Sequence, residues 1–244
     1  MKCLILAGGF GTRLGHLAEN TAKPLLALGP KPVISHIVDK VPPDMDIIVS
    51  INKRFESEFL EWRTGFSRDI DFFVEDACHN DKKLGALKSV HQTINIKEIR
   101  EDLLVIAGDN FFDFDIYDFL DNYDGTTPLV AIYDIKDRSK ARLFGVARLD
   151  RGRIVEFYEK PSQPVSSLVA IGCYLLPVRI FEHLSDCCTS HKDNLGEFIT
   201  YLINREDVSA YTFQGSWFDI GTVDAYKEAK KTIATKYVGA YERV

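Results

Sequence analysis

The stretch that most constrains the fold lies at the start of the chain, residues 2–24, KCLILAGGFGTRLGHLAENTAKP. Residues 3–7 form a short apolar run, which is typical of a buried strand. The run ends at Gly8 and Gly9, and Gly11 follows two residues later. Glycines after a strand let the backbone adopt positive φ and bring its N–H groups close to a ligand. The stretch therefore predicts a strand that ends in an anion-binding loop.

Two cations follow these glycines. Arg13 and Lys23 add full positive charge beside the loop, which favours a polyphosphate ligand. The stretch matches neither of two common phosphate motifs. The Gly-Lys-Ser/Thr ending of a P-loop is missing, and GGFGTR does not fit G-x-G-x-x-G.

Composition excludes several classes of protein. The chain has 244 residues, of which 45% are hydrophobic and 27% charged, as in a globular protein with a substantial core. Its formal net charge of −6 argues against a sequence-independent nucleic-acid binder. Five cysteines without zinc-type spacing predict buried free thiols in a reducing compartment. Because the first strand begins at the N-terminus and no apolar run is as long as a membrane span, we expect a cytoplasmic protein with no membrane partner.

Short apolar runs alternate with helical segments in the first half, which predicts parallel strands in a doubly wound α/β sheet with helices on both faces. The expected strands are 3–7, 46–51, 70–75 and 103–107, and the expected helices 33–41, 55–62 and 84–92. The second half predicts strands at 129–134, 144–149, 154–159, 170–176 and 208–213, and helices at 178–184, 196–204 and 222–235. We find no linker and expect a single domain over residues 1–244, with one half at about 1–125 and a mixed-strand half at about 126–230.

Ligands of open α/β sheets bind beyond the carboxyl ends of the strands. Gly8 and Asp109 both follow predicted strands, so we expect them to face one cleft. Asp109 is a candidate metal ligand, the alternative being a cap of the next helix. Asp113 and Asp115 form a D-x-D that glycosyltransferases use for metal binding, but we interpret them as surface positions ahead of the next helix.

Seven short motifs occur in one order along the chain: GGFGTRL at 8–14, KP at 23–24, GDN at 108–110, FGV at 144–146, EKP at 159–161, GCY at 172–174 and WFDIGT at 217–222. In this order they resemble the signatures of the sugar-1-phosphate nucleotidylyltransferases, and are most similar to those of glucose-1-phosphate thymidylyltransferases. The resemblance spans about residues 2–229.

The resemblance implies a reaction in which a sugar-1-phosphate oxygen attacks the α-phosphorus of a nucleoside triphosphate in line, and pyrophosphate leaves. It implies catalytic roles for Arg13 at the pyrophosphate, Lys23 near the α-phosphate and Lys160 at the sugar phosphate. It also implies that Asp109 and Asp219 hold Mg²⁺, which takes oxygen ligands and often uses one or two carboxylates with phosphates and water. No general base is needed, because the attacking oxygen is already a nucleophile at neutral pH.

The resemblance further implies two binding sets. The nucleotide would contact Leu6, Ala7, Gly8, Gly9, Gly11, Thr12, Glu75 and Gly85. The sugar phosphate would contact Asn110, Gly145, Glu159, Lys160 and Ala170.

Several alternatives stay open on the sequence alone. Glu75 could accept from N3–H of thymine or uracil, or from N1–H and the amino group of guanine. The charge of Glu75 does not decide between these bases. The resemblance to glucose-1-phosphate thymidylyltransferases implies dTTP or UTP with glucose-1-phosphate, the alternative being a guanylyltransferase for mannose- or heptose-1-phosphate. A glycosyltransferase and an inactive nucleotide-sugar sensor are the alternatives of another class. We expect no C-terminal left-handed β-helix, because hexapeptide repeats are absent, and the sequence leaves open whether the chain forms a homo-oligomer.

Overall fold

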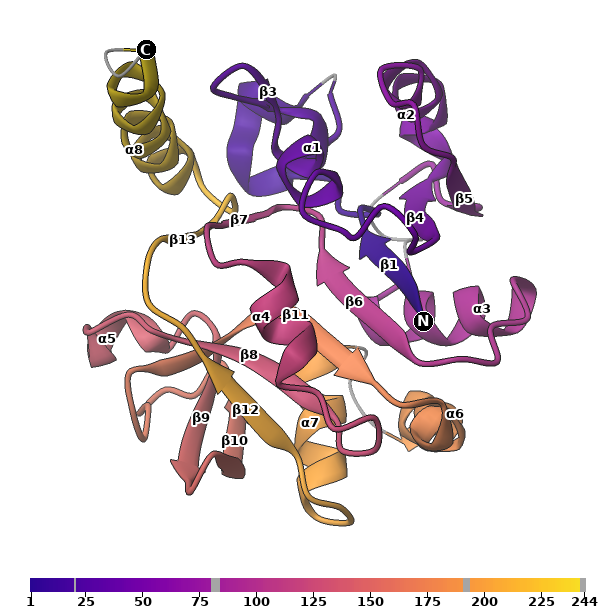
Figure 1. The fold of residues 1–244 in the computed structure, drawn as a ribbon, viewed down its shortest axis with the longest axis vertical. Helices are drawn as coiled ribbons and strands as arrows, with labels where there is room; N and C mark the ends of the chain where they lie inside the picture. Colours follow the sequence, from indigo (N-terminus) through magenta and orange to yellow (C-terminus); the bar gives the residue numbers. More distant parts are fainter. Residues whose placement is uncertain (20, 80–83, 191–193, 242–244) are drawn as a thin grey trace.

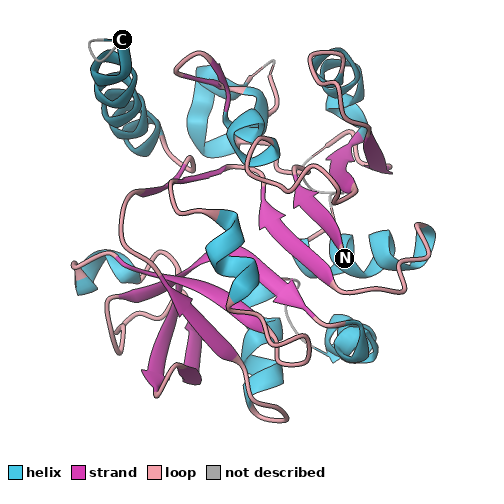
Figure 2. Ribbon diagram, viewed as in Figure 1, coloured by secondary structure: helices cyan, strands magenta, loops and turns pink. Residues whose placement is uncertain are grey.

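The structure, a computed structural model, describes residues 1–19, 21–79, 84–190 and 194–241. Its largest feature is a nine-stranded mixed sheet with the strand order β5-β4-β1-β6-β11-β8-β12-β10-β9 (Figures 1 and 2). The sheet runs without a break from the N-terminal half into the C-terminal half. Both halves therefore share one framework.

The N-terminal part of the sheet is parallel. It contains β1 (Lys2–Leu6), β4 (Ile47–Asn52), β5 (Ile70–Glu75) and β6 (Leu103–Ala107). All six residues of β4 are buried, as expected for a central parallel strand covered on both faces. Parallel pairing brings the carboxyl ends of the four strands to one edge of the sheet.

The C-terminal part is mixed, and β11 (Leu168–Leu176) joins it to the first part. β11 runs antiparallel to β6 and also to β8 (Leu129–Asp134). Beyond β8 lie β12 (Ser209–Thr212), β10 (Arg153–Glu159) and β9 (Gly145–Asp150). β9 also pairs back to β11 through Val146 and Val169, so this part of the sheet curls around on itself.

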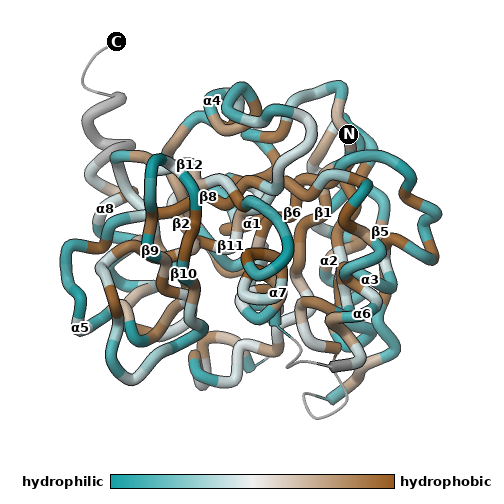
Figure 3. Tube along the Cα trace, turned by 90° about the horizontal axis from the view of Figure 1, so that it is seen from below, coloured by the Kyte–Doolittle hydropathy of each residue, from teal (hydrophilic) through white to brown (hydrophobic). Residues whose placement is uncertain are grey.

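Helices cover both faces of the sheet and bury separate apolar cores. One core includes side chains of α1 (Val33–Val38), α2 (Glu56–Arg63) and α4 (Ile116–Asp121). The other includes side chains of α3 (Ala86–Ile96), α6 (Phe181–Ser190) and α7 (Leu195–Ile203). Figure 3 shows the apolar strands between these layers, with hydrophilic segments around the outside. The predicted fold class is confirmed.

A third apolar core lies outside the large sheet. The long helix α8 (Val223–Tyr241) packs there against the 3-10 helix Thr12–Ala18 and β2 (Ala27–Leu28), which pairs with β3 (Lys31–Pro32). Tyr226 donates from its hydroxyl group to the Ala27 carbonyl oxygen at 2.6 Å. These contacts hold the end of the described chain against the segment that follows the glycine loop.

The predicted strands and most predicted helices are present within a few residues of their expected bounds. The helix expected at 33–41 already ends at Val38, and residues 178–180 are a 3-10 helix ahead of α6. No pattern of residues predicts α5 (Arg138–Ala141), the pairing of β2 with β3, or the pair β7 (Asn110–Phe112) and β13 (Trp217–Asp219). None of the five cysteines, all of which lie in the described ranges, forms a disulfide, but only three are buried as predicted, since Cys78 is exposed and Cys188 partly exposed. Among the described helices, none combines the length and the apolar character needed to cross a membrane.

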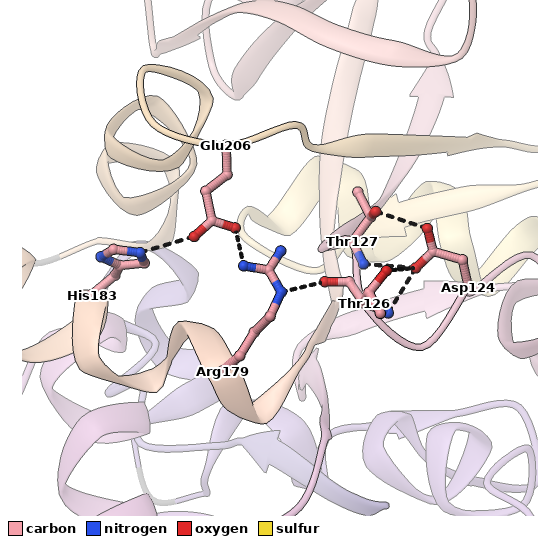
Figure 4. Close-up of polar contacts among 6 residues, drawn as sticks. All are labelled: Asp124, Thr126, Thr127, Arg179, His183 and Glu206. Atoms are coloured by element: carbon pink, nitrogen blue, oxygen red, sulfur yellow. Dashed lines mark hydrogen bonds and ion pairs between the residues drawn. The ribbon is translucent and has the colours of Figure 1, made fainter.

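A polar network far from the glycine loop ties three segments of the second half together (Figure 4). Arg179 donates from Nε to the Thr126 carbonyl oxygen at 2.8 Å, and its Nη1 lies 2.5 Å from Glu206 Oε2. The other Glu206 oxygen lies 2.9 Å from His183 Nε2. Asp124 accepts from the backbone N–H groups of Thr127 and Thr126, which hold the pKa of this carboxyl well below its usual value.

Candidate active site

A cavity of about 620 Å³ opens at the carboxyl ends of the parallel strands and continues to the ends of β9 and β10. Most of the predicted site residues line it: Leu6, Gly8, Gly9, Arg13, Glu75, Gly85, Asp109, Asn110, Gly145, Glu159, Lys160, Ala170 and Asp219. Four do not: Ala7, Gly11, Thr12 and Lys23. The structure therefore brings residues from both halves of the chain to one cavity.

The glycine loop uses its glycines in two ways. Gly11 has φ +64°, where other residues are strained, and a Cβ at this position would lie 2.9 Å from the Ala18 Cβ. Gly8 has no positive φ, contrary to the expectation. It is instead needed for close packing, because a Cβ there would lie 3.0 Å from Glu75 Oε1. Phe10 anchors the loop against Phe55, with 6.0 Å between the ring centroids.

Glu75 ends β5 and forms part of the cavity wall beside Gly85, although it is only 4% exposed. Ser50 donates from Oγ to Glu75 Oε1 at 3.0 Å, and the Leu84 N–H donates to Oε2 at 3.3 Å. A second hydroxyl group, that of Ser89, lies 2.7 Å from Ser50 Oγ. The Glu75 carboxylate is thus fixed by hydrogen bonds from β4 and from the segment ahead of α3, and Ser89 of α3 supports Ser50.

The two predicted metal ligands are brought together by the pairing of β7 with β13. This register places Asp219 opposite Asn110, and the Ile220 N–H donates to the Asp109 carbonyl oxygen at 2.9 Å. Burial raises the pKa of Asp219 to about 6, and the negative charge of Asp109 acts in the same direction. Lys23, Arg13 and Lys160 lower this pKa and do not cancel the rise.

Lys23 lies behind the two aspartates rather than in the cavity wall. Its Nζ makes an ion pair with Asp109 and lies 3.9 Å from Asp219 Oδ1. Lys23 is the first residue of a short 3-10 helix that follows the glycine loop, and its side chain is almost completely buried. One cation is therefore shared by two carboxylates.

The donor set fits a magnesium ion. Two carboxylates that share one ammonium group carry an excess negative charge, and Mg²⁺ commonly takes one or two carboxylates together with phosphates and water. Over the described ranges, no group of three or more His, Cys, Asp or Glu side chains is arranged to hold a metal. Two carboxylates alone would leave the other ligands of the ion to be supplied by substrate phosphates and water.

On the other side of the cavity, β10 ends in Glu159 and is followed by Lys160. Lys160 has φ +48°, and its N–H donates to the Phe144 carbonyl oxygen at 3.0 Å. Left-handed backbone at a non-glycine residue is costly and often occurs at functional sites. The Lys160 Nζ lies 3.3 Å from Glu159 Oε1 and is largely exposed to the cavity and solvent.

The Glu159 carboxylate lies between two glycines. A Cβ at Gly145 would lie 3.1 Å from Glu159 Oε2, and a Cβ at Gly196 would overlap the same oxygen. Gly196 is in the first turn of α7, where Asn194 caps the helix by accepting from the Glu197 N–H at 2.8 Å. No sequence motif points to Gly196 as a residue of the site. The pattern Asn-x-x-Glu at residues 194–197 predicts that Gly196 lies in the first turn of a helix. It does not predict that Gly196 contacts Glu159.

Asp113 and Asp115, the two aspartates of the D-x-D motif, each accept a hydrogen bond from a backbone N–H group of the protein. Asp115 is exposed and caps α4 by accepting from the Tyr117 N–H at 3.0 Å, in agreement with the expectation. Asp113 is only partly exposed, contrary to the expectation, because it accepts from the Ser216 N–H at 2.7 Å. A Cβ at Gly215 would overlap the Asp113 carboxylate, so this contact requires a glycine. Neither aspartate lines the cavity.

Comparison with known proteins shows which family the chain belongs to. The model of the nucleotidyl transferase family matches residues 2–236. The chain belongs to the nucleotidyl transferase family, and the predicted family is thereby confirmed.

Among its relatives is the bifunctional protein GlmU of Methanocaldococcus jannaschii, 30% identical over 241 residues, which are 97% of this chain and 55% of that protein. Another is the glucose-1-phosphate adenylyltransferase of Thermosipho africanus, 29% identical over 93% of this chain and 60% of the relative. The chain thus spans a little over half the length of these curated relatives.

Two solved structures have the same fold over nearly their whole length. One, from Bacillus anthracis, is provisionally described as a glucose-1-phosphate thymidylyltransferase in complex with a sucrose. It has a TM-score of 0.84 and 26% identity, and the match covers 95% of this chain and 94% of that one. The other is a UDP-glucose pyrophosphorylase complexed with UDP-glucose, with a TM-score of 0.79, 22% identity and coverage of 96% and 98%.

Proposed function

We propose that the chain is a sugar-1-phosphate nucleotidylyltransferase, which converts a nucleoside triphosphate and a sugar-1-phosphate into a nucleotide sugar and pyrophosphate. The observation that carries the proposal is the position of the Asp109–Asp219 pair in one cavity, between the glycine loop and the Glu159–Lys160 strand end. Such a cavity suits two phosphorylated molecules that must approach each other. We assign the nucleotide to the half at about 1–125 and the sugar phosphate to the half at about 126–230.

The nucleotide half supplies charge and orientation. Arg13 lines the cavity beside Gly8 and Gly9, where it can neutralise the departing pyrophosphate. Asp109 and Asp219 would hold Mg²⁺, which supplies positive charge to the nucleotide phosphates when it is bound. Lys23 keeps the two carboxylates close together, and we assign its charge to stabilising the same region near the α-phosphate.

The sugar half orients the nucleophile. Lys160 would pair with the sugar phosphate, whose oxygen attacks the α-phosphorus as the bond to pyrophosphate breaks. Glu159 accepts hydrogen bonds from sugar hydroxyl groups, and Gly145 and Ala170 allow the sugar to approach the wall of the cavity. No proton has to be removed from the attacking oxygen, so placement and charge account for the catalysis.

The proposed substrate pair is dTTP or UTP with glucose-1-phosphate. The Glu75 carboxylate can only accept hydrogen bonds, so it suits a base that presents an N–H group at that edge. Thymine and uracil present N3–H. Guanine presents N1–H and an amino group, so a guanylyltransferase acting on mannose- or heptose-1-phosphate is the second candidate.

The test is a matrix of five nucleoside triphosphates against several sugar-1-phosphates, measured by pyrophosphate release with Mg²⁺ and again with excess EDTA. We expect metal-dependent release for one base class, with the highest kcat/KM for a pair that contains glucose-1-phosphate. Sugar transfer from a nucleotide sugar without pyrophosphate release would support a glycosyltransferase instead. Binding of nucleotide sugars without turnover of any pair would support a sensor.

A further inference from the structure

Trp217 makes a polar contact in the cavity that has no role in the reaction proposed above. Its Nε1–H donates to Asn110 Oδ1 at 2.8 Å, and both side chains are more than 90% buried. The indole ring is held by Phe144 and Tyr133, with centroid separations of 5.0 and 5.9 Å. Both Trp217 and Asn110 line the sugar side of the cavity.

This contact determines which way the Asn110 amide faces. An indole N–H can only donate, so its partner must be the amide oxygen and not the amide nitrogen. The Asn110 Nδ2 is thereby turned away from Trp217, toward Gly172 and Asp109. Nδ2 lies 3.4 Å from Asp109 Oδ1, and a Cβ at Gly172 would lie 3.3 Å from it. Gly172 has φ +76° and lines the cavity, so the backbone leaves room beside the amide nitrogen.

On this basis, and resting on the proposed function, we propose that Trp217 is a positioning residue that makes Asn110 a hydrogen-bond donor toward the sugar phosphate. Asn110 then offers N–H on one side of the sugar pocket, and Glu159 offers only acceptor oxygens on the other. Such a pair favours a sugar phosphate that accepts a hydrogen bond from Asn110 and donates a hydroxyl hydrogen bond to Glu159. Without Trp217 the amide can rotate by 180° and present its oxygen instead, which weakens that selection.

The experiment is a double-mutant cycle between Trp217→Phe and Asn110→Ala, with pyrophosphate release and calorimetric binding of glucose-1-phosphate as readouts. We expect Trp217→Phe to lower kcat/KM for the sugar phosphate by about tenfold, the loss of roughly one hydrogen bond, while KM for the triphosphate changes less than about twofold. In the Asn110→Ala background the same change should have almost no further effect. Equal effects in both backgrounds would contradict the positioning role.

The chain offers a matched control in Trp62, whose Nε1–H donates to Ser35 Oγ at 2.9 Å outside the cavity. Trp62→Phe removes a comparable hydrogen bond and should leave the kinetics of both backgrounds unchanged. A wild-type protein that releases no pyrophosphate with any pair contradicts the proposed function, and this role with it. Turnover by wild type with additive Trp217→Phe and Asn110→Ala effects contradicts the role alone.

A second measurement needs no change at Trp217. In ¹⁵N-labelled protein, Asn110→Ala should shift the indole N–H resonance of Trp217 upfield and leave that of Trp62 in place. Glucose-1-phosphate should perturb the Trp217 resonance in wild type but much less in Asn110→Ala. A Trp217 resonance that is unchanged by Asn110→Ala would overturn the proposal, even if Trp217→Phe does not fold.

Discussion

Two clusters of carboxylates and basic side chains in this molecule differ in the number of carboxylates that each cation serves. In the network around Arg179, one carboxylate, Glu206, has the guanidinium on one oxygen and His183 on the other (Figure 4). In the cavity, two carboxylates, Asp109 and Asp219, share the single ammonium group of Lys23. Within ion-pair distance, the first cluster has one carboxylate for one guanidinium group, whereas the second has two carboxylates for one ammonium group.

The consequence of this difference appears at Asp219. Burial, and to a smaller extent the neighbouring charge of Asp109, raise its pKa to about 6, so the ionised form of Asp219 is disfavoured there. A structural cluster has no reason to keep such a cost, but a site that binds a cation recovers it on binding. The comparison therefore predicts that disruption of the cavity cluster abolishes activity, while disruption of the Arg179 network reduces only stability.

The largest expected effect is that of Asp109→Asn. The change removes one of the two carboxylates that would hold Mg²⁺, so we expect turnover to fall by about 100-fold or more. The fold should survive, because Lys23 keeps Asp219 as a partner and the Asp109 carbonyl contact to Ile220 is unaffected. Pyrophosphate release measures the first result, and the thermal midpoint by circular dichroism measures the second.

Asp207→Asn is the control for that variant. Asp207 makes an exposed ion pair with Arg153 at 2.5 Å, far from the cavity lining. We expect its turnover to stay at the wild-type rate. Wild-type turnover of Asp109→Asn would remove this residue from the site.

Lys160→Ala is expected to have the next largest effect. Loss of the cation at the sugar phosphate should reduce kcat/KM by about 100-fold, mainly through the sugar-1-phosphate. Lys136 is a well-matched control, because it is also an exposed lysine with a left-handed backbone, at φ +58°, and pairs with Asp134 at 2.8 Å. Lys136→Ala should keep wild-type kinetics. Equal losses in the two variants would show that the effect of Lys160→Ala is not specific to the sugar-phosphate side of the cavity.

The residues of this site that the sequence predicts are those that directly follow a recognisable strand. Apolar runs predict the parallel strands, and the loop that begins at Gly8 follows the first of them. Asp109 follows β6 for the same reason. Because parallel strands end at one edge of a sheet, their order along the chain is enough to predict that these residues face one cleft.

The remainder depends on contacts between residues far apart in sequence, which carry no local signal. β7 and β13 contain only three residues each, too few for a periodic pattern, yet their pairing brings Asp219 to Asp109. The contact between Glu159 and Gly196 of α7 cannot be predicted either, because the two residues lie far apart in the sequence. Lys23 was predicted at the phosphates, but its position behind the aspartates depends on the turn after the glycine loop.

A smaller effect on activity is expected from Gly196→Ala. The added Cβ would overlap Glu159 Oε2 and displace the carboxylate, so we expect KM for the sugar-1-phosphate to rise about tenfold and KM for the triphosphate to change little. Overpacking should also destabilise the protein by about 1–3 kcal/mol. Gly65→Ala is the control, since its Cβ would make only an ordinary contact, 3.4 Å from the Trp62 carbonyl oxygen. A triphosphate KM that rises as much as that of the sugar would contradict the assignment of Glu159 to the sugar.

The smallest effect on catalysis is expected from Arg179→Met, which disrupts the Arg179–Glu206 network instead of the aspartate pair in the cavity. The variant loses the ion pair with Glu206 and the hydrogen bond to the Thr126 carbonyl oxygen, but keeps an apolar stem. Because Arg179 is about half exposed, we expect the free energy of unfolding to fall by only about 1 kcal/mol, with kcat/KM within twofold of wild type.

Arg148 provides the reference for that measurement, because it forms a more exposed ion pair with Glu156 at 2.5 Å, on the strand pair β9 and β10. Arg148→Met should leave the urea midpoint unchanged, since exposed pairs of this kind contribute little. A clear stability loss in Arg179→Met but not in Arg148→Met would show that the network around Glu206 stabilises the fold as a unit. A large loss of turnover in Arg179→Met without unfolding would instead couple this network to the cavity, and the contrast between a balanced and an unbalanced cluster would no longer separate structure from function.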